Sequence, residues 1–300
     1  MSGSARMRAF VAVAETGSIR AAAAKLFITE SSVSTAVTAL SREIGVPLIE
    51  RAGRGIRMTP SGQRYAEYAR KILGLEAEAV AAARGEVDPE RGLIRLAAVT
   101  TAAEHLVPQL LASFRAQHPA VELQLEVLNR HRVWPKLLAH EVDLVLAGRP
   151  PEGLPLVVRA RRANSLVVVA APELAERFTV DSATWLMREE GSGIRDTCVS
   201  LLASMEVSPA CLTLGSNGAV IAGAAAGLGV TLVSRDAVGG KLAAGTVVEL
   251  AVPGTPLDRP WHAVTNDRPS ASTRLFLRHL EQHHDPLTGG WTTVRAAPLN

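Results

Sequence analysis

The chain has 300 residues, which is too long for one typical hydrophobic core and fits two or three folded units. Hydrophobic residues make up 47% and charged residues 20%, a composition that excludes an intrinsically disordered chain. The formal charge of +3 is uneven: residues 1–71 carry eleven Lys/Arg against five Asp/Glu, or +6, which leaves −3 for the remainder. A basic N-terminal end is typical of nucleic-acid binding, although a solvated basic surface would give the same count.

Cysteine usage and the absence of long apolar runs bear on location. Cys198 and Cys211 are too few for a disulfide framework and match no metal-site spacing, which favours a reducing cytoplasm. The first residues lack the apolar stretch of a signal peptide. The longest apolar run, residues 219–233, contains glycines and is shorter than the roughly 18 residues that a membrane span needs. We therefore expect a cytoplasmic protein without a membrane partner.

The first 62 residues predict three helices and a hairpin. Apolar residues at helical spacing predict helices over 6–17, 19–26 and 30–44, with glycines ending the first and third. Residues 48–50 and 56–58 flank the basic segment RAGRG, which predicts a two-stranded wing with a glycine-rich tip. The segment 1–62 is therefore predicted to be a winged helix-turn-helix.

A long helix is predicted to follow the wing. Thr59 and Pro60 are a typical N-cap and first helical residue, and the pattern runs to about Arg84. Two series at seven-residue intervals, offset by three, give the a/d relation of a coiled-coil seam: Tyr65, Ile72, Ala79 and Tyr68, Leu75, Ala82. We favour a dimerising linker helix, ending in a polar hinge over 85–92, for the segment 63–90. The alternative is an amphipathic helix packed on its own domain.

Strands and helices alternate from residue 91 onward, which predicts α/β layers around mainly parallel sheets. The expected strands include 93–99, 121–128, 142–147, 166–170, 230–233 and 261–265. The expected helices include 102–117, 131–140, 193–205, 219–226 and 270–284. Residues 286–300 are predicted to form a flexible tail.

Residues 18–51 resemble the DNA-binding motif of the LysR-type transcriptional regulators. The positions that match at fixed spacing are Ser18, Ala22, Ala23, Leu26, Val33, Ser34, Leu40, Glu43, Gly45, Leu48, Glu50 and Arg51, followed by Gly53, Arg54, Thr59, Pro60 and Gly62. Length and domain order extend the resemblance over the whole chain. The chain departs from the family at residues 30–32, usually Gln-Pro-Ala, at Thr35, usually Arg or Lys, and at Ser41, often Glu. The family's base preferences therefore do not transfer.

The resemblance implies an α+β, multidomain architecture: a winged helix-turn-helix, a long linker helix and a C-terminal two-lobed α/β domain like that of periplasmic binding proteins. This effector-binding domain would span 91–285, with lobe I at about 91–163 and 264–285 and lobe II at about 164–263. Within the family, the C-terminal part is most similar to regulators of Calvin-cycle (RuBisCO, carbon-fixation) operons, although sulfur and nitrogen regulators share several stretches. The stretches that carry this similarity are 100–104, 143–151, 188–195, 214–219 and 259–262.

The third predicted helix supplies candidate DNA contacts, because a helix in the major groove reads bases with its N-terminal residues. The candidates are Thr29, Glu30, Ser31, Ser32, Ser34, Thr35 and Thr38 on this helix and Arg51, Arg54 and Arg57 in the wing. Hydroxyls can bond phosphates or base edges. Glu30 can accept a hydrogen bond from cytosine N4, or its charge can simply stabilise the positive N-terminal end of the helix. Arg51 can contact DNA or form an ion pair within the domain.

Candidate effector contacts lie where strands end and helices begin, since free N–H groups there favour anions. They are Thr100, Thr101, Asn129, Arg149, Ser192, Gly193, Arg195 and Asn217. Three of them have structural alternatives. Thr101 and Glu104 have capping-box spacing, Asn217 is a good N-cap, and Arg149 could pair with Glu141 or Asp143.

The predicted function is a DNA-binding transcriptional regulator controlled by a small anionic effector, with no cofactor and no metal. Enzyme motifs such as Gly-x-Ser-x-Gly, His-Glu-x-x-His and the Walker sequence do not occur, so no enzyme is predicted. The resemblance implies four partners: double-stranded operator DNA, a phosphorylated metabolite or nucleotide of central carbon metabolism, further copies in a dimer or tetramer, and RNA polymerase. A solute-binding protein of the same two-lobed fold is the alternative, which the basic N-terminal domain disfavours. Activation and repression both stay open.

Overall fold

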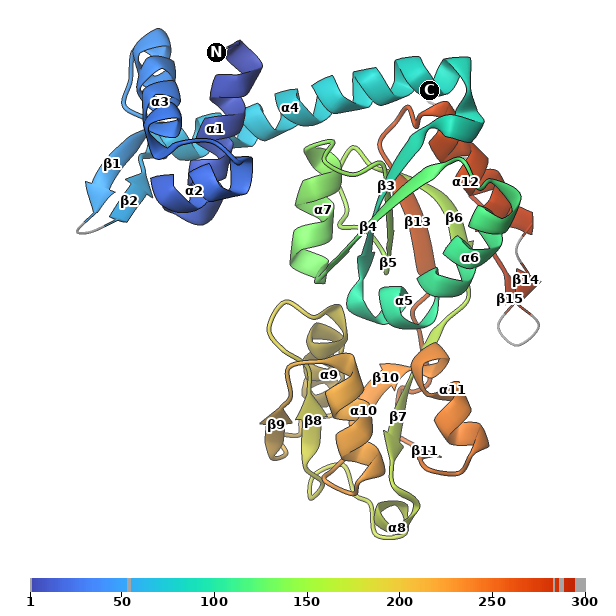
Figure 1. The fold of residues 1–300 in the computed structure, drawn as a ribbon. Coiled ribbons are helices and arrows are strands. Elements are labelled where there is room, and N and C mark those ends of the chain that lie inside the picture. Colours follow the sequence, from blue (N-terminus) through green and yellow to red (C-terminus); the bar gives the residue numbers. More distant parts are fainter. Residues whose placement is uncertain (1, 53–54, 283, 286–288, 295–300) are drawn as a thin grey trace. The chain divides into compact units, whose positions relative to one another are not determined.

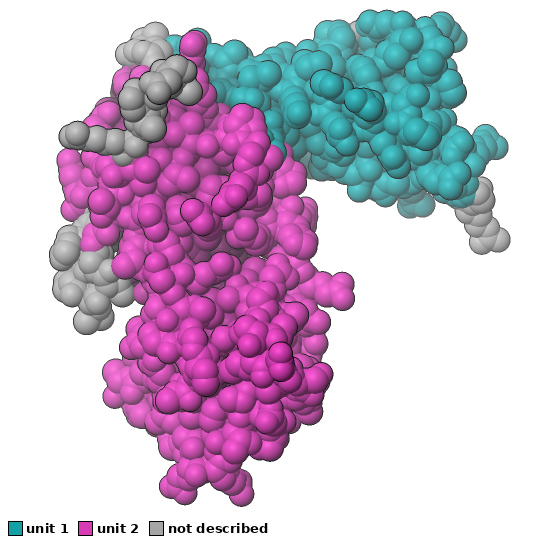
Figure 2. Space-filling model, turned by 180° about the vertical axis from the view of Figure 1, so that it is seen from behind, with its two compact units in different colours: residues 1–83, 138–142 teal, residues 84–137, 143–300 magenta. Residues whose placement is uncertain are grey.

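A computed structural model describes residues 2–52, 55–282, 284–285 and 289–294. The chain forms two compact units, residues 1–83 with 138–142 and residues 84–137 with 143–300 (Figure 2). The first unit holds the N-terminal helices and most of a long helix. The second holds two α/β lobes, each built on its own sheet (Figure 1).

Three short helices and a hairpin form the N-terminal end of the first unit. They are α1 (Gly3–Thr16), α2 (Ile19–Leu26), α3 (Glu30–Ile44), β1 (Ile49–Ala52) and β2 (Gly55–Met58). The hydroxyls of Ser2, Ser18 and Thr29 cap these helices, each accepting a hydrogen bond from a first-turn N–H. The helices pack over a core that includes Phe10 and Val33. The predicted winged helix-turn-helix is confirmed, and the wing tip at 53–54 lies outside the described residues.

Helix α4 (Pro60–Val87) begins where the sequence predicts it. The Thr59 hydroxyl accepts a hydrogen bond from the Gly62 N–H at 2.9 Å and donates one to the Pro47 carbonyl at 2.7 Å. Gly62 is required by a close approach, because a Cβ there would lie 1.9 Å from the Leu48 carbonyl oxygen. This first turn of α4 is therefore anchored to the chain that enters the wing.

Helix α4 ends later than predicted. It continues to Val87, and only then does the short 3-10 helix η1 (Pro89–Arg91) follow. The prediction that the hinge begins at Gly85 is therefore wrong. Among the residues that the structure describes, no helix is both long and apolar enough to cross a membrane.

Large apolar side chains lie exposed along α4. Tyr68, Ile72 and Leu75 are 56%, 48% and 48% exposed. Tyr65, which the heptad pattern assigns to the same seam, instead packs edge-on against Phe10, with ring centroids 5.5 Å apart. The seam stays a prediction for Tyr68, Ile72 and Leu75 and is wrong for Tyr65.

The first lobe of the second unit is a six-stranded sheet in the order β16-β6-β13-β5-β3-β4. Figure 1 labels five of these strands, β3, β4, β5, β6 and β13. Its strands are β3 (Leu93–Val99), β4 (Glu122–Leu128), β5 (Leu144–Ala147), β6 (Val157–Arg162), β13 (Trp261–Thr265) and β16 (Thr292–Thr293). Its helices are α5 (Thr100–His105), α6 (Val107–Gln117), α7 (Arg130–Leu138) and α12 (Ala271–Gln282). β3 pairs in parallel with β4 and β5, whereas β13 is antiparallel to β5 and β6. Leu96, Leu110, Leu144 and Phe276 belong to its core.

The second lobe is built around β7. Its strands are β7 (Ser165–Ala170), β8 (Trp185–Met187), β9 (Cys211–Thr213), β10 (Thr231–Ser234), β11 (Val248–Leu250) and β12 (Leu257–Asp258). Its helices are α8 (Pro172–Ala175), α9 (Gly193–Ser204), α10 (Asn217–Ala225) and α11 (Arg235–Ala243). β7 is antiparallel to β10, β11 and β12, while β8 and β9 form a separate parallel pair. The prediction of mainly parallel sheets is therefore wrong for this lobe.

Two further expectations differ from the structure. Strand β13 pairs within the first sheet, so the second lobe ends before residue 261 rather than at about 263. Part of the predicted flexible tail is ordered, because β15 (Gly289–Gly290) pairs with β14 (His284–Asp285) and β16 pairs with β6. Residues 286–288 and 295–300 lie outside the described residues.

Candidate DNA-binding surface and effector cavity

Helix α3 presents a polar row on the side away from its core. Glu30, Ser31, Ser34, Thr35 and Thr38 are exposed, whereas the apolar residues between them are buried. The row follows from helical periodicity, since apolar positions three and four apart occupy the opposite face. The exposed row begins at the N-terminal turn, where a helix in the major groove contacts base edges.

Three of the predicted DNA contacts, Thr29, Ser31 and Ser32, already hydrogen-bond one another at the start of the helix. The Thr29 hydroxyl accepts a hydrogen bond from the Ser32 N–H at 3.2 Å. It also lies 2.9 Å from the Ser31 hydroxyl and 2.8 Å from the Ser32 hydroxyl, and Ser32 is half-buried. Thr29, Ser31 and Ser32 therefore shape the start of α3, which leaves the later hydroxyls freer to reach a ligand.

In the described part of the wing, one arginine is paired and one has no ion pair. Arg57 lies directly opposite Glu50 across the hairpin, and its Nη2 is 2.7 Å from the Glu50 carboxylate. Arg51 is exposed and has no ion pair among the described residues. The ion pair within this domain, expected as an alternative for Arg51, is thus formed by Arg57. Arg54 lies outside the described residues.

In the second unit, a cavity of about 70 Å³ lies between the two lobes. Residues at the ends of β3, β4 and β8 line it together with the helix starts that follow them. Five of the predicted effector contacts line this cavity: Thr100, Thr101, Asn129, Ser192 and Gly193. Ser192 is the N-cap residue of α9, but its hydroxyl makes no capping hydrogen bond, so it can bond a ligand instead.

Glycines allow α9 to approach the other lobe closely. A Cβ on Gly191 would lie 2.8 Å from the Asn129 amide nitrogen, and Gly191 also has a φ of +82°. A Cβ on Gly193 would lie 3.0 Å from the Arg130 Cδ. A side chain at either position would have to displace the Asn129 or the Arg130 side chain.

Three arginines that the sequence analysis missed line the same cavity: Arg130, Arg188 and Arg259. Arg188 is neutralised, because its Nε and Nη2 lie 2.7 and 2.8 Å from the Glu189 carboxylate oxygens. Burial opposes ionisation of Glu189, but the hydrogen bonds from Arg188, a backbone hydrogen bond and the charge of Arg188 together outweigh it and lower the pKa of Glu189. This pair therefore adds polar groups without net charge.

Arg130 and Arg259 have no ion pair among the described residues and lie close enough to repel each other. Burial and the Arg130 guanidinium both lower the pKa of Arg259, against the opposing effect of Asp196. Two guanidiniums that share a partly buried cavity are costly unless an anion joins them. The cavity is therefore positive and suited to an oxyanion.

The remaining predicted effector residues lie elsewhere. Arg195 donates to the Arg188 carbonyl at 2.7 Å and to the Thr213 hydroxyl at 3.2 Å, so it supports the cavity wall rather than lining it. Asn217 is fully buried, with its Oδ1 3.4 Å from Arg188 and its Nδ2 3.3 Å from Glu104. Neither residue is among those that line the interlobe cavity.

Both capping alternatives are wrong. Ser216, not Asn217, caps α10 by accepting a hydrogen bond from the Ala219 N–H. Thr101 lies inside α5, whose N-cap is Val99 without a side-chain hydrogen bond, so no capping box forms with Glu104. Thr101 is buried and lines the cavity.

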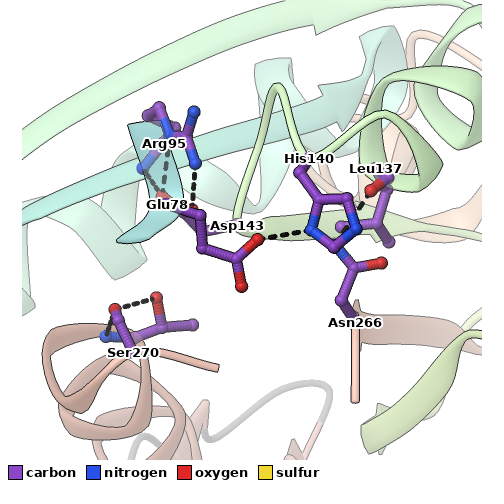
Figure 3. A network of polar contacts seen from close by, with 8 residues as sticks. Glu78, Arg95, Leu137, His140, Asp143, Asn266 and Ser270 are labelled. Carbon is purple, nitrogen blue, oxygen red and sulfur yellow. Dashed lines mark hydrogen bonds and ion pairs between the residues drawn. The ribbon is translucent and has the colours of Figure 1, made fainter. Parts of the chain in front are cut away.

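Arg149 lines a different cavity, next to β13, together with the buried His262. The pairing of Arg149 with Asp143, considered as an alternative, is wrong. Arg95 Nη2 lies 2.6 Å from the Asp143 carboxylate, and the Arg95 backbone N–H donates to the same group at 2.7 Å (Figure 3). Arg149 has no ion pair among the residues that the structure describes.

His262 gives the protein a pH-dependent stability. Burial and the guanidiniums of Arg161, Arg149 and Arg259 lower the pKa of His262 from 6.5 to about 4, against the opposing effect of a backbone hydrogen bond with Pro260. Between pH 6.5 and 4 the imidazole is therefore protonated in the unfolded chain but neutral in the folded chain. The free energy of unfolding falls as the pH drops through this range, by at most about 3 kcal/mol. The free energy of unfolding from urea titrations at pH 7.5, 5.5 and 4.5 should decline less in His262→Gln than in the wild type. Parallel declines would show that His262 does not couple to folding.

Comparison with known proteins decides the family. Residues 4–63 match the model of the bacterial regulatory helix-turn-helix proteins of the lysR family, and residues 88–285 match the LysR substrate binding domain. The chain belongs to the LysR family of transcriptional regulators. The regulator is therefore a DNA-binding protein and not an enzyme, and the resemblance seen in the sequence is confirmed.

Individual relatives show which members of the family the chain resembles. The chain is 33% identical over 288 residues to the HTH-type transcriptional regulator CfxR of Cupriavidus necator, covering 93% of this chain and 90% of CfxR. It is 31% identical to the RuBisCO operon transcriptional regulator of Acidithiobacillus ferrooxidans, covering 92% of each. The regulatory domain of CcmR from Synechocystis PCC6803, solved in complex with 2-PG, is 29% identical with a TM-score of 0.58, covering 62% of this chain and 94% of that domain. The similarity of this LysR-family regulator to carbon-fixation regulators is thus confirmed.

Proposed function

We propose that this regulator binds a small phosphorylated carboxylate in the interlobe cavity and controls a carbon-fixation operon in response. The observation that carries the proposal is the pair Arg130 and Arg259, which share one cavity without a carboxylate partner among the described residues. A dianion between them would replace repulsion with charge-assisted hydrogen bonds. The Ser192 hydroxyl and the first N–H groups of α9 would complete its coordination.

The relatives support the choice of ligand and operon. One similar regulatory domain is solved in complex with 2-PG, and we choose 2-phosphoglycolate as the probe on that ground. Another relative is named for the RuBisCO operon. Calorimetric titration of the full chain should give binding of 2-phosphoglycolate and much weaker binding of glycolate, which lacks the phosphate. Equal heats for the two compounds would count against a phosphate site in the cavity.

At the DNA end, α3 would enter the major groove with Ser34, Thr35 and Thr38 towards the bases, while the wing contacts the backbone. A second copy, joined through α4, would place two such heads on a two-fold operator. We further propose a cytoplasmic location and contact with RNA polymerase, both of which follow from regulation of transcription.

Arg51→Ala should weaken DNA binding on all sequences alike and lower the slope of log K against log[salt] by about one, because it removes one phosphate contact. Arg57→Ala should have a smaller effect, since Arg57 must leave Glu50 before it can reach a phosphate. Gel-shift titrations between low and high salt measure both slopes. Arg268→Ala, with a side chain 95% exposed in the other unit, is the charge-matched control. An unchanged salt dependence in Arg51→Ala would show that Arg51 of the wing does not contact a DNA phosphate.

A further inference from the structure

A second cavity in the two-lobed unit is larger than the interlobe one. Its volume is about 490 Å³, and it lies beside β6 and β13. Its walls come from the loop after β5, from β6, from the crossing between β12 and β13, and from Val294 beyond β16. It therefore touches the chain close to both crossings between the lobes, at Arg161 and at residues 258–260.

Positive charge converges on this cavity. Arg149, Arg161 and Arg259 line it, and all three guanidiniums act on His262. Glu152 and Asp258 line it too, but neither forms an ion pair with these arginines among the described residues. Three guanidiniums around one space, against two unpaired carboxylates, leave the cavity with a net positive charge.

A buried ring nitrogen without a hydrogen-bond partner adds an independent indication of a ligand. His262 is 5% exposed, and its Nδ1 has no hydrogen-bond partner within the described part of the chain. Leaving a buried polar atom without a partner is costly, and such atoms commonly mark an absent ligand or water. In the sheet, His262 lies directly opposite Arg161 on β6 and Ala147 on β5, two residues before Arg149. His262 therefore has Arg161 as its neighbour on one side of β13, and Arg149 follows its neighbour on the other side by two residues.

We propose that this cavity is a second anion site, which binds the phosphate group of a small metabolite through Arg149, Arg161 and the His262 imidazole. Nδ1 of the imidazole would hydrogen-bond the phosphate, and the two guanidiniums would donate the charge-assisted hydrogen bonds. The size of the cavity leaves room for the rest of a metabolite beyond its phosphate.

Arg259 lines both cavities, which couples the two sites. A ligand in the second site that attracts the Arg259 guanidinium would weaken an anion in the interlobe cavity, and the reverse would hold by the same factor. This coupling rests on the proposed effector site, whereas the second anion site itself does not.

The test follows the His262 imidazole nitrogen resonances of the full chain, labelled with ¹⁵N-histidine and assigned with His262→Gln, during titration with inorganic phosphate. We expect a saturable shift in the wild type. In Arg161→Ala the phosphate concentration at half-saturation should rise about 10- to 100-fold, the loss of one charged hydrogen bond. Arg161 is exposed, so its removal should leave the fold intact.

Two controls separate this site from general charge and from the interlobe cavity. Arg268→Ala should titrate like the wild type, because that side chain lies in neither cavity. Arg130→Ala should also keep the shift, since Arg130 lines only the interlobe cavity. The proposal is overturned if His262 does not respond to phosphate, if Arg161→Ala titrates like the wild type, or if Arg130→Ala abolishes the shift. Failure of 2-phosphoglycolate to bind would leave this readout unaffected.

Discussion

Replacing Ile72 with aspartate is expected to yield monomers and to weaken binding to a two-fold operator by about 100- to 10,000-fold, since the second head no longer binds at a high effective concentration. The reason is the exposed apolar stripe of Tyr68, Ile72 and Leu75 on α4, which a partner copy would cover. A carboxylate in such an interface would be buried without a partner. Sedimentation velocity at micromolar protein and gel shifts on whole and half operators measure the two effects.

Ala77→Asp is the matched control, because it adds the same charge to another exposed position of α4. In a helix, position 77 lies about 140° around the axis from position 72. The control should remain dimeric and bind the whole operator like the wild type. A dimeric Ile72→Asp protein would show that α4 does not hold the copies together.

The N-terminal domain could be predicted from the sequence because its signals are local. Gly17 and Gly45 have φ values of +65° and +83°, which end α1 and α3 where the chain must turn. Thr59 and Pro60 likewise start α4 by local chemistry. The assignment of Tyr65 to the seam failed for the opposite reason. Its partner Phe10 lies 55 positions earlier, and no heptad pattern contains that contact.

The sheet of the second lobe shows a different limit. Alternate residues of β7 belong to two separate apolar clusters, so the strand is buried on both faces. A strand buried on both faces reads as a continuous apolar run whichever way its neighbours point. The antiparallel pairing of β7 with β10, β11 and β12 could therefore not be predicted from the periodicity of the sequence.

The candidate effector residues also divide into those that local sequence signals indicate and those that only the fold brings together. That Thr100, Asn129 and Ser192 line one cavity could be predicted, because each lies where a strand ends and a helix begins. Arg130, the first residue of α7, meets the same criterion and could have been found. Arg259 could not, since it lies in a crossing between the lobes and only the folded chain brings it to the cavity. Arg149 follows a strand end too, but its loop contributes to the second cavity.

Arg130→Glu is expected to abolish the response to 2-phosphoglycolate, lowering its affinity on the order of 1,000-fold or more. The change removes one charged hydrogen bond and adds a carboxylate that repels the phosphate and can pair with Arg259. The fold should persist, because an acidic residue in the first turn of α7 is favoured by the helix dipole. Calorimetry measures the affinity, and gel shifts with and without the compound measure the response of DNA binding.

DNA binding without the compound should stay close to that of the wild type, because a ligand acts only by preferring one conformation of its domain. Arg132→Glu makes the same charge change two residues later, on an exposed side chain that does not line the cavity. This variant should keep both the affinity for 2-phosphoglycolate and the response of DNA binding to that compound. If Arg130→Glu and Arg132→Glu lose affinity to the same extent, the effect comes from the overall charge of the lobe. If Arg130→Glu melts like the wild type and still binds 2-phosphoglycolate normally, the compound does not bind between Arg130 and Arg259.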